Sequence, residues 1–85
     1  MPEISRFYGI VIKMNRGDHP PPHFHARYGG KMISVAIKDG DVTGVFPPRQ
    51  MALVERWRSL HVVELFDNWR RAGTTEDLAR IQPLE

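Results

Sequence analysis

Hydrophobic and polar residues alternate over the first half of the chain in a pattern typical of β-strands. Residues 7–14 are apolar on both alternating faces, which predicts a strand buried on both sides. Residues 23–28 alternate strictly, and aliphatic side chains recur at every second position within residues 31–38. The Asp39-Gly40 pair that follows is a strong signal for a tight turn into a strand at residues 42–46. The pattern therefore predicts four antiparallel strands in a meander.

The second half of the chain predicts a single long helix. Pro48 is suited to the first turn of a helix, because the N–H that proline lacks would have no partner there. Residues 49–72 contain neither Gly nor Pro, and Gly73 is suited to end the helix. We therefore predict an α+β fold, in which a four-stranded antiparallel meander sheet packs against one long C-terminal helix. At about 100° per residue, the face of this helix toward the sheet consists of Leu53, Val54, Trp57, Leu60, His61, Glu64 and Leu65.

Two polar residues, His61 and Glu64, interrupt this otherwise apolar helix face and lie one turn apart. Buried polar side chains normally have hydrogen-bonding partners. The two residues are therefore expected either to pair with each other as a structural element or to complete a functional site.

A second apolar strip on the helix consists of Val62, Phe66 and Trp69. It is expected either to contact the C-terminal residues or to form an interface with a partner chain, in a homodimer or in a complex with another protein. The apolar C-terminal residues are Leu78, Ile81 and Leu84.

Length, charge and hydropathy narrow the class of protein. The 85 residues allow one modest hydrophobic core, so we expect a single domain over residues 1–85. The 12 Lys and Arg are interleaved with 10 Asp and Glu, which gives nucleic acid only weak support as a partner. No apolar run approaches the roughly 20 residues of a membrane span, and the first residues do not resemble a secretory signal. We therefore expect a cytoplasmic protein without membrane association.

Three of the four histidines lie within residues 18–29, the stretch most strongly biased toward one chemistry. Three consecutive prolines at residues 20–22 stiffen it. The strand that follows is expected to place His23, His25 and Arg27 on one face, because side chains alternate along a strand.

A divalent metal ion such as Zn²⁺ is one ligand that fits this stretch. Neutral imidazole is the commonest protein metal ligand, and the chain has no cysteine to supply a thiolate. His23 and His25 therefore form a candidate metal site, with His19 or Asp18 as a third ligand. An open position on the ion would lower the pKa of bound water and permit hydrolysis. By itself, the His-x-His pair is a weak signal.

Two other interpretations need no metal. In one, a histidine acts as a general base while arginines hold a phosphate or carboxylate, as in a small phosphoesterase or ribonuclease. In the other, the histidines are structural or bind a partner, and their rings donate hydrogen bonds to backbone carbonyls or to Glu64. The candidate catalytic residues are His23, His25, His61 and Glu64, and the candidate anion-binding residues are Arg27 and Arg49.

Several segments together form a recognisable combination. They are residues 2–10, the histidine block at residues 18–29, Pro47-Pro48-Arg49, the Trp57 and His61 pair, and residues 81–84. This combination covers nearly the whole chain and resembles the bacterial domain-of-unknown-function family numbered 4160.

The resemblance implies a small bacterial protein encoded beside a member of another uncharacterised family, numbered 2442, in an arrangement similar to toxin–antitoxin pairs. It supplies no catalytic residues. We therefore expect a protein-binding or regulatory component of a two-gene toxin–antitoxin-like module, whose partner is a small protein encoded by the neighbouring gene. The alternative is a small metal-dependent or histidine-based hydrolase that acts on phosphodiesters.

Overall fold

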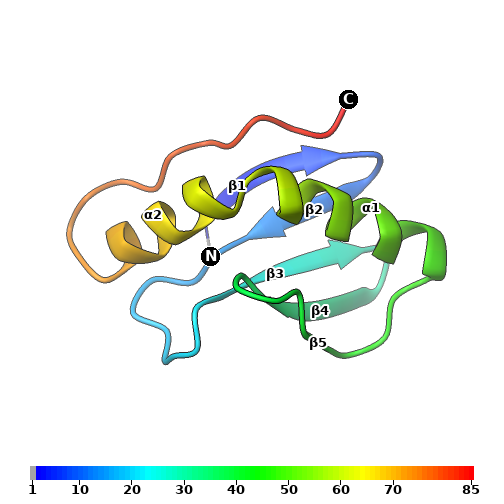
Figure 1. Ribbon diagram of the computed structural model, residues 1–85, viewed down its shortest axis with the longest axis horizontal. Coiled ribbons are helices and arrows are strands. Elements are labelled where there is room, and N and C mark those ends of the chain that lie inside the picture. Colours follow the sequence, from blue (N-terminus) through cyan, green and yellow to red (C-terminus); the bar gives the residue numbers. More distant parts are fainter. Residues whose placement is uncertain (1) are drawn as a thin grey trace.

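The computed structural model describes residues 2–85, which form an α+β fold with an antiparallel sheet on one side and helices on the other (Figure 1). The five strands of these residues follow one another in space in chain order. They are β1 (Glu3–Phe7), β2 (Ile10–Lys13), β3 (His23–Tyr28), β4 (Lys31–Ala36) and β5 (Val42–Thr43). The helices are α1 (Pro48–Leu60) and α2 (Val62–Ala72).

The predicted meander is confirmed, but the prediction of four strands is wrong. The apolar run at residues 7–14 contains a tight turn at Tyr8 and Gly9, and Phe7 pairs with Ile10 across it. Both turn residues have a positive φ, 50° and 78°, as the tightest hairpin turns require. The run therefore belongs to two antiparallel strands, β1 and β2. Because both are apolar, the hydrophobic pattern alone did not reveal the turn.

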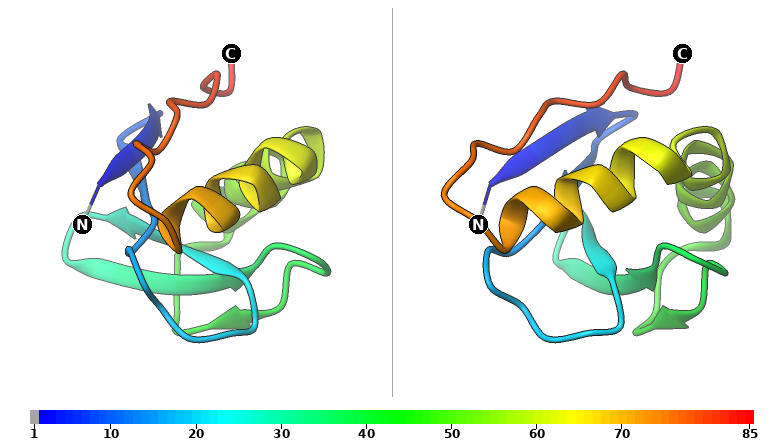
Figure 2. Two further views of the ribbon diagram at one scale, coloured as in Figure 1. Left: turned by 90° about the vertical axis from the view of Figure 1, so that its left-hand side faces the viewer. Right: turned by 60° about the vertical axis from the view of Figure 1, so that its left-hand side comes forward.

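The prediction of one long helix is also wrong, because the chain leaves the helical conformation at His61. This residue has φ −129° and ψ 26°, and its N–H donates to the carbonyl of Arg58 in a tightened final turn of α1. In the right-hand view of Figure 2, α2 runs across the picture while α1 is seen nearly end-on, so the chain changes direction sharply. The change turns Leu60 and Glu64 toward solvent, away from the sheet-facing side predicted for them.

The core lies between the helices and one face of the sheet. Trp57 of α1 is fully buried, and its ring centre lies 5.5 Å from that of Phe7 and 5.6 Å from that of Phe24. The alternation predicted for β3 and β4 is confirmed, because the residues predicted to face inward from these strands include a fully buried set. That set is Phe24, Ala26, Ile33 and Val35.

The C-terminal residues form neither helix nor strand, yet they are held along β1 (Figure 1). The N–H of Ile81 donates to the carbonyl of Ile4 at 2.8 Å, and the buried Ser5 hydroxyl donates to the carbonyl of Ile81 at 3.0 Å. Buried Asn68 of α2 bonds both the carbonyl and the N–H of Ala79. Of the apolar C-terminal residues, Ile81 belongs to the buried core, and Leu78 and Leu84 are partly buried against it.

Within residues 2–85, neither α1 nor α2 is long and apolar enough to cross a membrane.

Candidate metal centre

The alternation of side chains along β3 places two of the histidines on the same face of the sheet. His23 and His25 lie on the face opposite Phe24 and Ala26, as predicted, and both are partly buried. Their ring centres are 5.2 Å apart and the rings meet edge to face at 81°. The strand thus presents two imidazoles to the same region of space.

Asp18 brings a carboxylate to these rings from the loop between β2 and β3. Its Oδ2 atom lies 3.0 Å from Nε2 of His23 and 3.8 Å from Nε2 of His25. One ligand atom from each of the three residues lies within 4.8 Å of the other two. Two imidazole nitrogens and one carboxylate oxygen at such spacing form a donor set suited to a divalent transition-metal ion.

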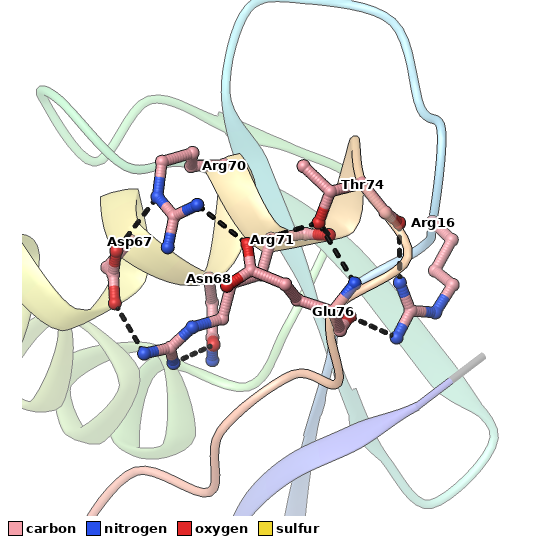
Figure 3. A network of polar contacts seen from close by, with 7 residues as sticks. All are labelled: Arg16, Asp67, Asn68, Arg70, Arg71, Thr74 and Glu76. Carbon is pink, nitrogen blue, oxygen red and sulfur yellow. Dashed lines mark hydrogen bonds and ion pairs between the residues drawn. The ribbon is translucent and has the colours of Figure 1, made fainter.

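The loop that carries Asp18 is tied to the far end of α2. The N–H of Gly17 donates to the carbonyl of Ala72 at 3.0 Å. The guanidinium of Arg16 donates to the carbonyls of Thr74 and Glu76 at 3.1 and 2.6 Å, as Figure 3 shows. The carboxylate is therefore held in place by contacts between segments far apart in the sequence.

A backbone carbonyl orients the His23 ring. The Nδ1 atom of His23 lies 2.7 Å from the carbonyl oxygen of Pro21, and because a carbonyl can only accept, Nδ1 carries the proton. In the neutral ring, Nε2 is then an acceptor that faces a carboxylate oxygen of Asp18 at 3.0 Å. Two acceptors at this distance need a proton or a metal cation between them. Metal-binding histidines usually donate a hydrogen bond from the ring nitrogen that does not bind the metal, as Nδ1 of His23 does to Pro21.

Asn15 and the backbone of His19 contact the other two ligand groups. The side-chain nitrogen of Asn15 lies 3.3 Å from Oδ2 of Asp18 and 3.4 Å from Nε2 of His25. The backbone N–H of His19 donates to the other carboxylate oxygen of Asp18 at 2.9 Å. The bond from His19 orients Asp18 at the oxygen that is not a candidate ligand, whereas Asn15 contacts the candidate ligand atoms themselves and would have to release them to a bound metal.

The charge states of Asp18 and His25 suit a cation. The hydrogen bond from the backbone N–H of His19 lowers the pKa of Asp18 below its ordinary value of 3.8, which keeps the carboxylate ionised near neutral pH. Burial, followed by repulsion from His23, lowers the pKa of His25 below its ordinary value of 6.5. The neutral imidazole that metal binding requires is therefore favoured.

The structure places His19 at the rim of this cluster. Its side chain is 88% exposed, and its Nδ1 atom contacts the outer carboxylate oxygen of Asp18 at 3.1 Å. Its ring centre lies 6.2 Å from that of His23. Of the two third ligands suggested by the sequence, the geometry thus brings Asp18, and not His19, together with His23 and His25.

The predicted His61 and Glu64 pair is formed, but away from the cluster of Asp18, His23 and His25. Nδ1 of His61 lies 2.6 Å from a carboxylate oxygen of Glu64, and the His61 ring centre lies 5.5 Å from that of Trp57. His61 lines a separate cleft with Arg56, Leu60 and residues 82–85. The structure therefore does not join this pair to the histidines of β3.

The cluster opens into a cleft of about 460 Å³. The two arginines that the sequence suggested for anion binding, Arg27 and Arg49, are exposed and are not part of its lining. Sequence reasoning missed Ser34, Thr43 and Asp41, although pairing β3 with the next two strands would have found the first two. The cleft is lined by Asn15, Asp18, His19, Pro21, His23, His25, Ser34, Ala36, Asp41 and Thr43.

Trp69 is a further neighbour that the sequence did not assign to this site. Its ring centre lies 5.3 Å from that of His23, with an angle of 49° between the planes. Sequence reasoning had placed Trp69 on an apolar strip for the C-terminal residues or a partner. The contact instead connects α2 to a candidate metal ligand.

Comparison with known proteins gives one match. The family described as Domain of unknown function (DUF4160) matches residues 9–70, which include the histidine block, the helix entry and the Trp57 and His61 pair. The resemblance inferred from these motifs is confirmed, while residues 2–8 and 81–84 lie outside the matched range. No curated protein and no solved structure is similar enough to match this chain.

Proposed function

The chain belongs to the Domain of unknown function (DUF4160) family, whose name assigns no activity, and we propose from the site that it binds a divalent transition-metal ion. The proposed ligands are Asp18, His23 and His25. The observation that carries the proposal is the convergence of one carboxylate oxygen and two imidazole nitrogens, with Asp18 and His23 each oriented by a hydrogen bond at an atom that is not a proposed ligand. Such outer contacts distinguish a built site from a chance grouping of polar side chains.

The donor set favours some ions over others. Mg²⁺ and Ca²⁺ prefer ligand shells made of oxygen atoms, whereas imidazole nitrogens suit Zn²⁺, Fe²⁺, Co²⁺ and Ni²⁺. Three protein ligands leave at least one position for water, and a metal-bound water can have a pKa near about 7. Hydrolysis is therefore the reaction class that this site would support. A phosphodiester would receive its charge compensation from the ion alone, because no Lys or Arg lines the cleft within residues 2–85.

Calorimetric titration of the metal-free protein with zinc and nickel chloride tests the metal site. We expect one ion per chain with micromolar or tighter affinity, and no binding by the double variant His23→Ala, His25→Ala. His61→Ala is the matched control, because it removes a partly buried histidine that lies outside the cleft. The proposal fails if micromolar metal gives no heat change, or if the double variant binds like the natural sequence.

A second function, binding to a partner protein, is supported by exposed apolar side chains on the two helices, while the two-gene toxin–antitoxin-like module rests on the family resemblance alone. Leu60, Val63 and Phe66 are 62%, 82% and 38% exposed. The surface differs from the interface inferred from sequence, because Val62 and Trp69 pack against the core and Phe66 alone is common to both sets. We propose that the neighbouring gene product binds here, with a homodimer as the other arrangement.

Light scattering after size-exclusion chromatography, with and without the neighbouring gene product, tests this second proposal. We expect a stable complex that the double variant Val63→Glu, Phe66→Glu loses. Val63 is 82% exposed, so Val63→Glu is expected to change the free energy of unfolding by about 0.5 kcal/mol or less, whereas Phe66 is 38% exposed and Phe66→Glu is expected to lower it by about 1 kcal/mol. Thermal unfolding establishes that the double variant remains folded. Val45→Glu is the control, because Val45 is 78% exposed and lies outside both helices. A natural chain that stays monomeric and unbound contradicts the proposal.

A further inference from the structure

The cleft beside the candidate metal ligands extends across two more strands. His25 of β3 pairs with Ser34 of β4, and Ser34 pairs with Thr43 of β5. Directly paired residues lie on the same face of a sheet, and neighbouring strands are about 4.8 Å apart. Two hydroxyl groups therefore follow His25 at about one and two strand spacings.

A second row of neighbouring residues runs across the sheet from His23 to Asp41. His23 pairs with Ala36, and the N–H of Ala36 donates to the carbonyl of Asp41 at 2.9 Å. Asp41 lines the cleft, and its hydrogen bonds within residues 2–85 are made by its backbone N–H and carbonyl. Asp41 therefore borders the cleft beside Ala36, and within residues 2–85 its carboxylate makes no hydrogen bond that would neutralise its charge.

The charges of the cleft select among ligands for its open space. Two carboxylates and no Lys or Arg belong to its lining within the described chain, residues 2–85. The positive charge of a bound divalent ion would be offset by the Asp18 carboxylate, and Asp41 adds a second negative charge to the lining. An anionic group extending over Ala36 would approach the Asp41 carboxylate, whereas a cationic group there would gain a counter-ion.

We propose that the cleft takes a small molecule with a metal-binding oxygen or nitrogen at one end and a cationic amine at the other. This inference rests on the proposed metal site. Asp41 is the counter-ion for the amine, Ala36 leaves room for the connecting chain, and Ser34 and Thr43 offer hydrogen bonds along its length. The volume of about 460 Å³ lies within the usual range of roughly 300–1,000 Å³ for small-molecule sites.

The inference is tested with three hydroxamates. They share the metal-binding group and differ in the charge at their other end. The zinc-loaded protein is titrated with acetohydroxamate, with 4-aminobutanohydroxamate and with the monohydroxamate of succinate. These probes carry a neutral, a cationic and an anionic remote end. We expect the cationic probe to bind about threefold more tightly than the neutral probe, as for a partly exposed ion pair. The anionic probe is expected to bind most weakly.

Two charge-matched variants assign the preference to its residue. Asp41→Asn is expected to equalise the neutral and cationic probes, while Glu85→Gln removes the same charge from an exposed carboxylate outside the cleft and keeps the preference. Equal affinity for all three probes, a preference for the anionic probe, or a preference that survives Asp41→Asn would overturn the inference. Failure of zinc to bind at all would instead overturn the metal site, so the two failures are distinguishable.

Discussion

Replacing Asp18 with Asn is expected to weaken zinc binding by roughly 100-fold or more, whereas replacing His19 with Ala should change it little. Asp18 directs Oδ2 toward both imidazole Nε2 atoms, and Asn offers only a neutral oxygen in the same volume. His19 contacts the opposite carboxylate oxygen, and its side chain is 88% exposed. Its backbone N–H, which also bonds Asp18, remains in the Ala variant.

Competition with a colorimetric zinc chelator measures both affinities on the same scale. Far-ultraviolet circular dichroism and thermal unfolding of the metal-free variants establish that each remains folded. The comparison distinguishes two ligand sets that share His23 and His25. A large loss in His19→Ala and a small loss in Asp18→Asn would show that His19 is the third ligand and that the observed cluster is not the metal site.

The difference between these ligand sets shows how far the sequence could predict the site. The alternation along β3 was sufficient to place His23 and His25 on one face. The third ligand depends on the path of the β2–β3 loop, which is fixed by Gly17 and Arg16 through backbone carbonyls near the end of α2. Bonds to distant carbonyls leave no pattern in the sequence. The sequence therefore could not establish that the Asp18 carboxylate lies beside His23 and His25.

The two main errors in the fold have different origins. The turn at Tyr8 and Gly9 lies inside an apolar run, and Tyr is an unusual residue at a positive φ. The break at His61 contains neither Gly nor Pro, and the weak helix formers beside it, Ser59, Val62 and Val63, lower helix propensity too little to predict a break. At the first place Gly9 was a local turn signal that the apolar residues on both sides obscured, whereas at His61 no glycine or proline marks the break. Asp39-Gly40 does lie in the connection between two antiparallel strands, as predicted, but the connection is wider than a tight turn, because Ala36 bonds Asp41 and residues 37–40 lie between them. The strand predicted at residues 42–46 is limited to Val42–Thr43.

The break at His61 also explains why the predicted helix face was only partly right. Val54 and Trp57 precede the break and Leu65 follows it, and all three are fully buried. Leu60 and Glu64 were assigned to the same face on the assumption of a continuous helix, but both are exposed. Two short helices can each turn an apolar side toward a strongly twisted sheet, which one straight helix could not follow over its whole length.

Trp57 is the residue on which these packing contacts depend most, and Trp57→Ala is expected to lower the free energy of unfolding by about 3–5 kcal/mol. The fully buried indole packs on Phe7 and Phe24 and contacts His61 at the helix break. Its N–H donates to the carbonyl of Gln82 at 2.9 Å, which ties the C-terminal residues to α1. A domain of this size is typically stable by about 4–13 kcal/mol, so the loss is a large fraction of the total.

Urea denaturation followed by far-ultraviolet circular dichroism measures this change without using Trp fluorescence. Trp57→Phe keeps an aromatic ring in the core but loses the bond to Gln82, so we expect a smaller loss of about 1–2 kcal/mol. Val63→Ala, which truncates an 82% exposed side chain, is the control and should change stability by about 0.5 kcal/mol or less. Removal of the indole should leave a cavity that the surrounding sheet cannot fill. If Trp57→Ala nevertheless changed stability as little as this control, the indole would not be the centre of the core.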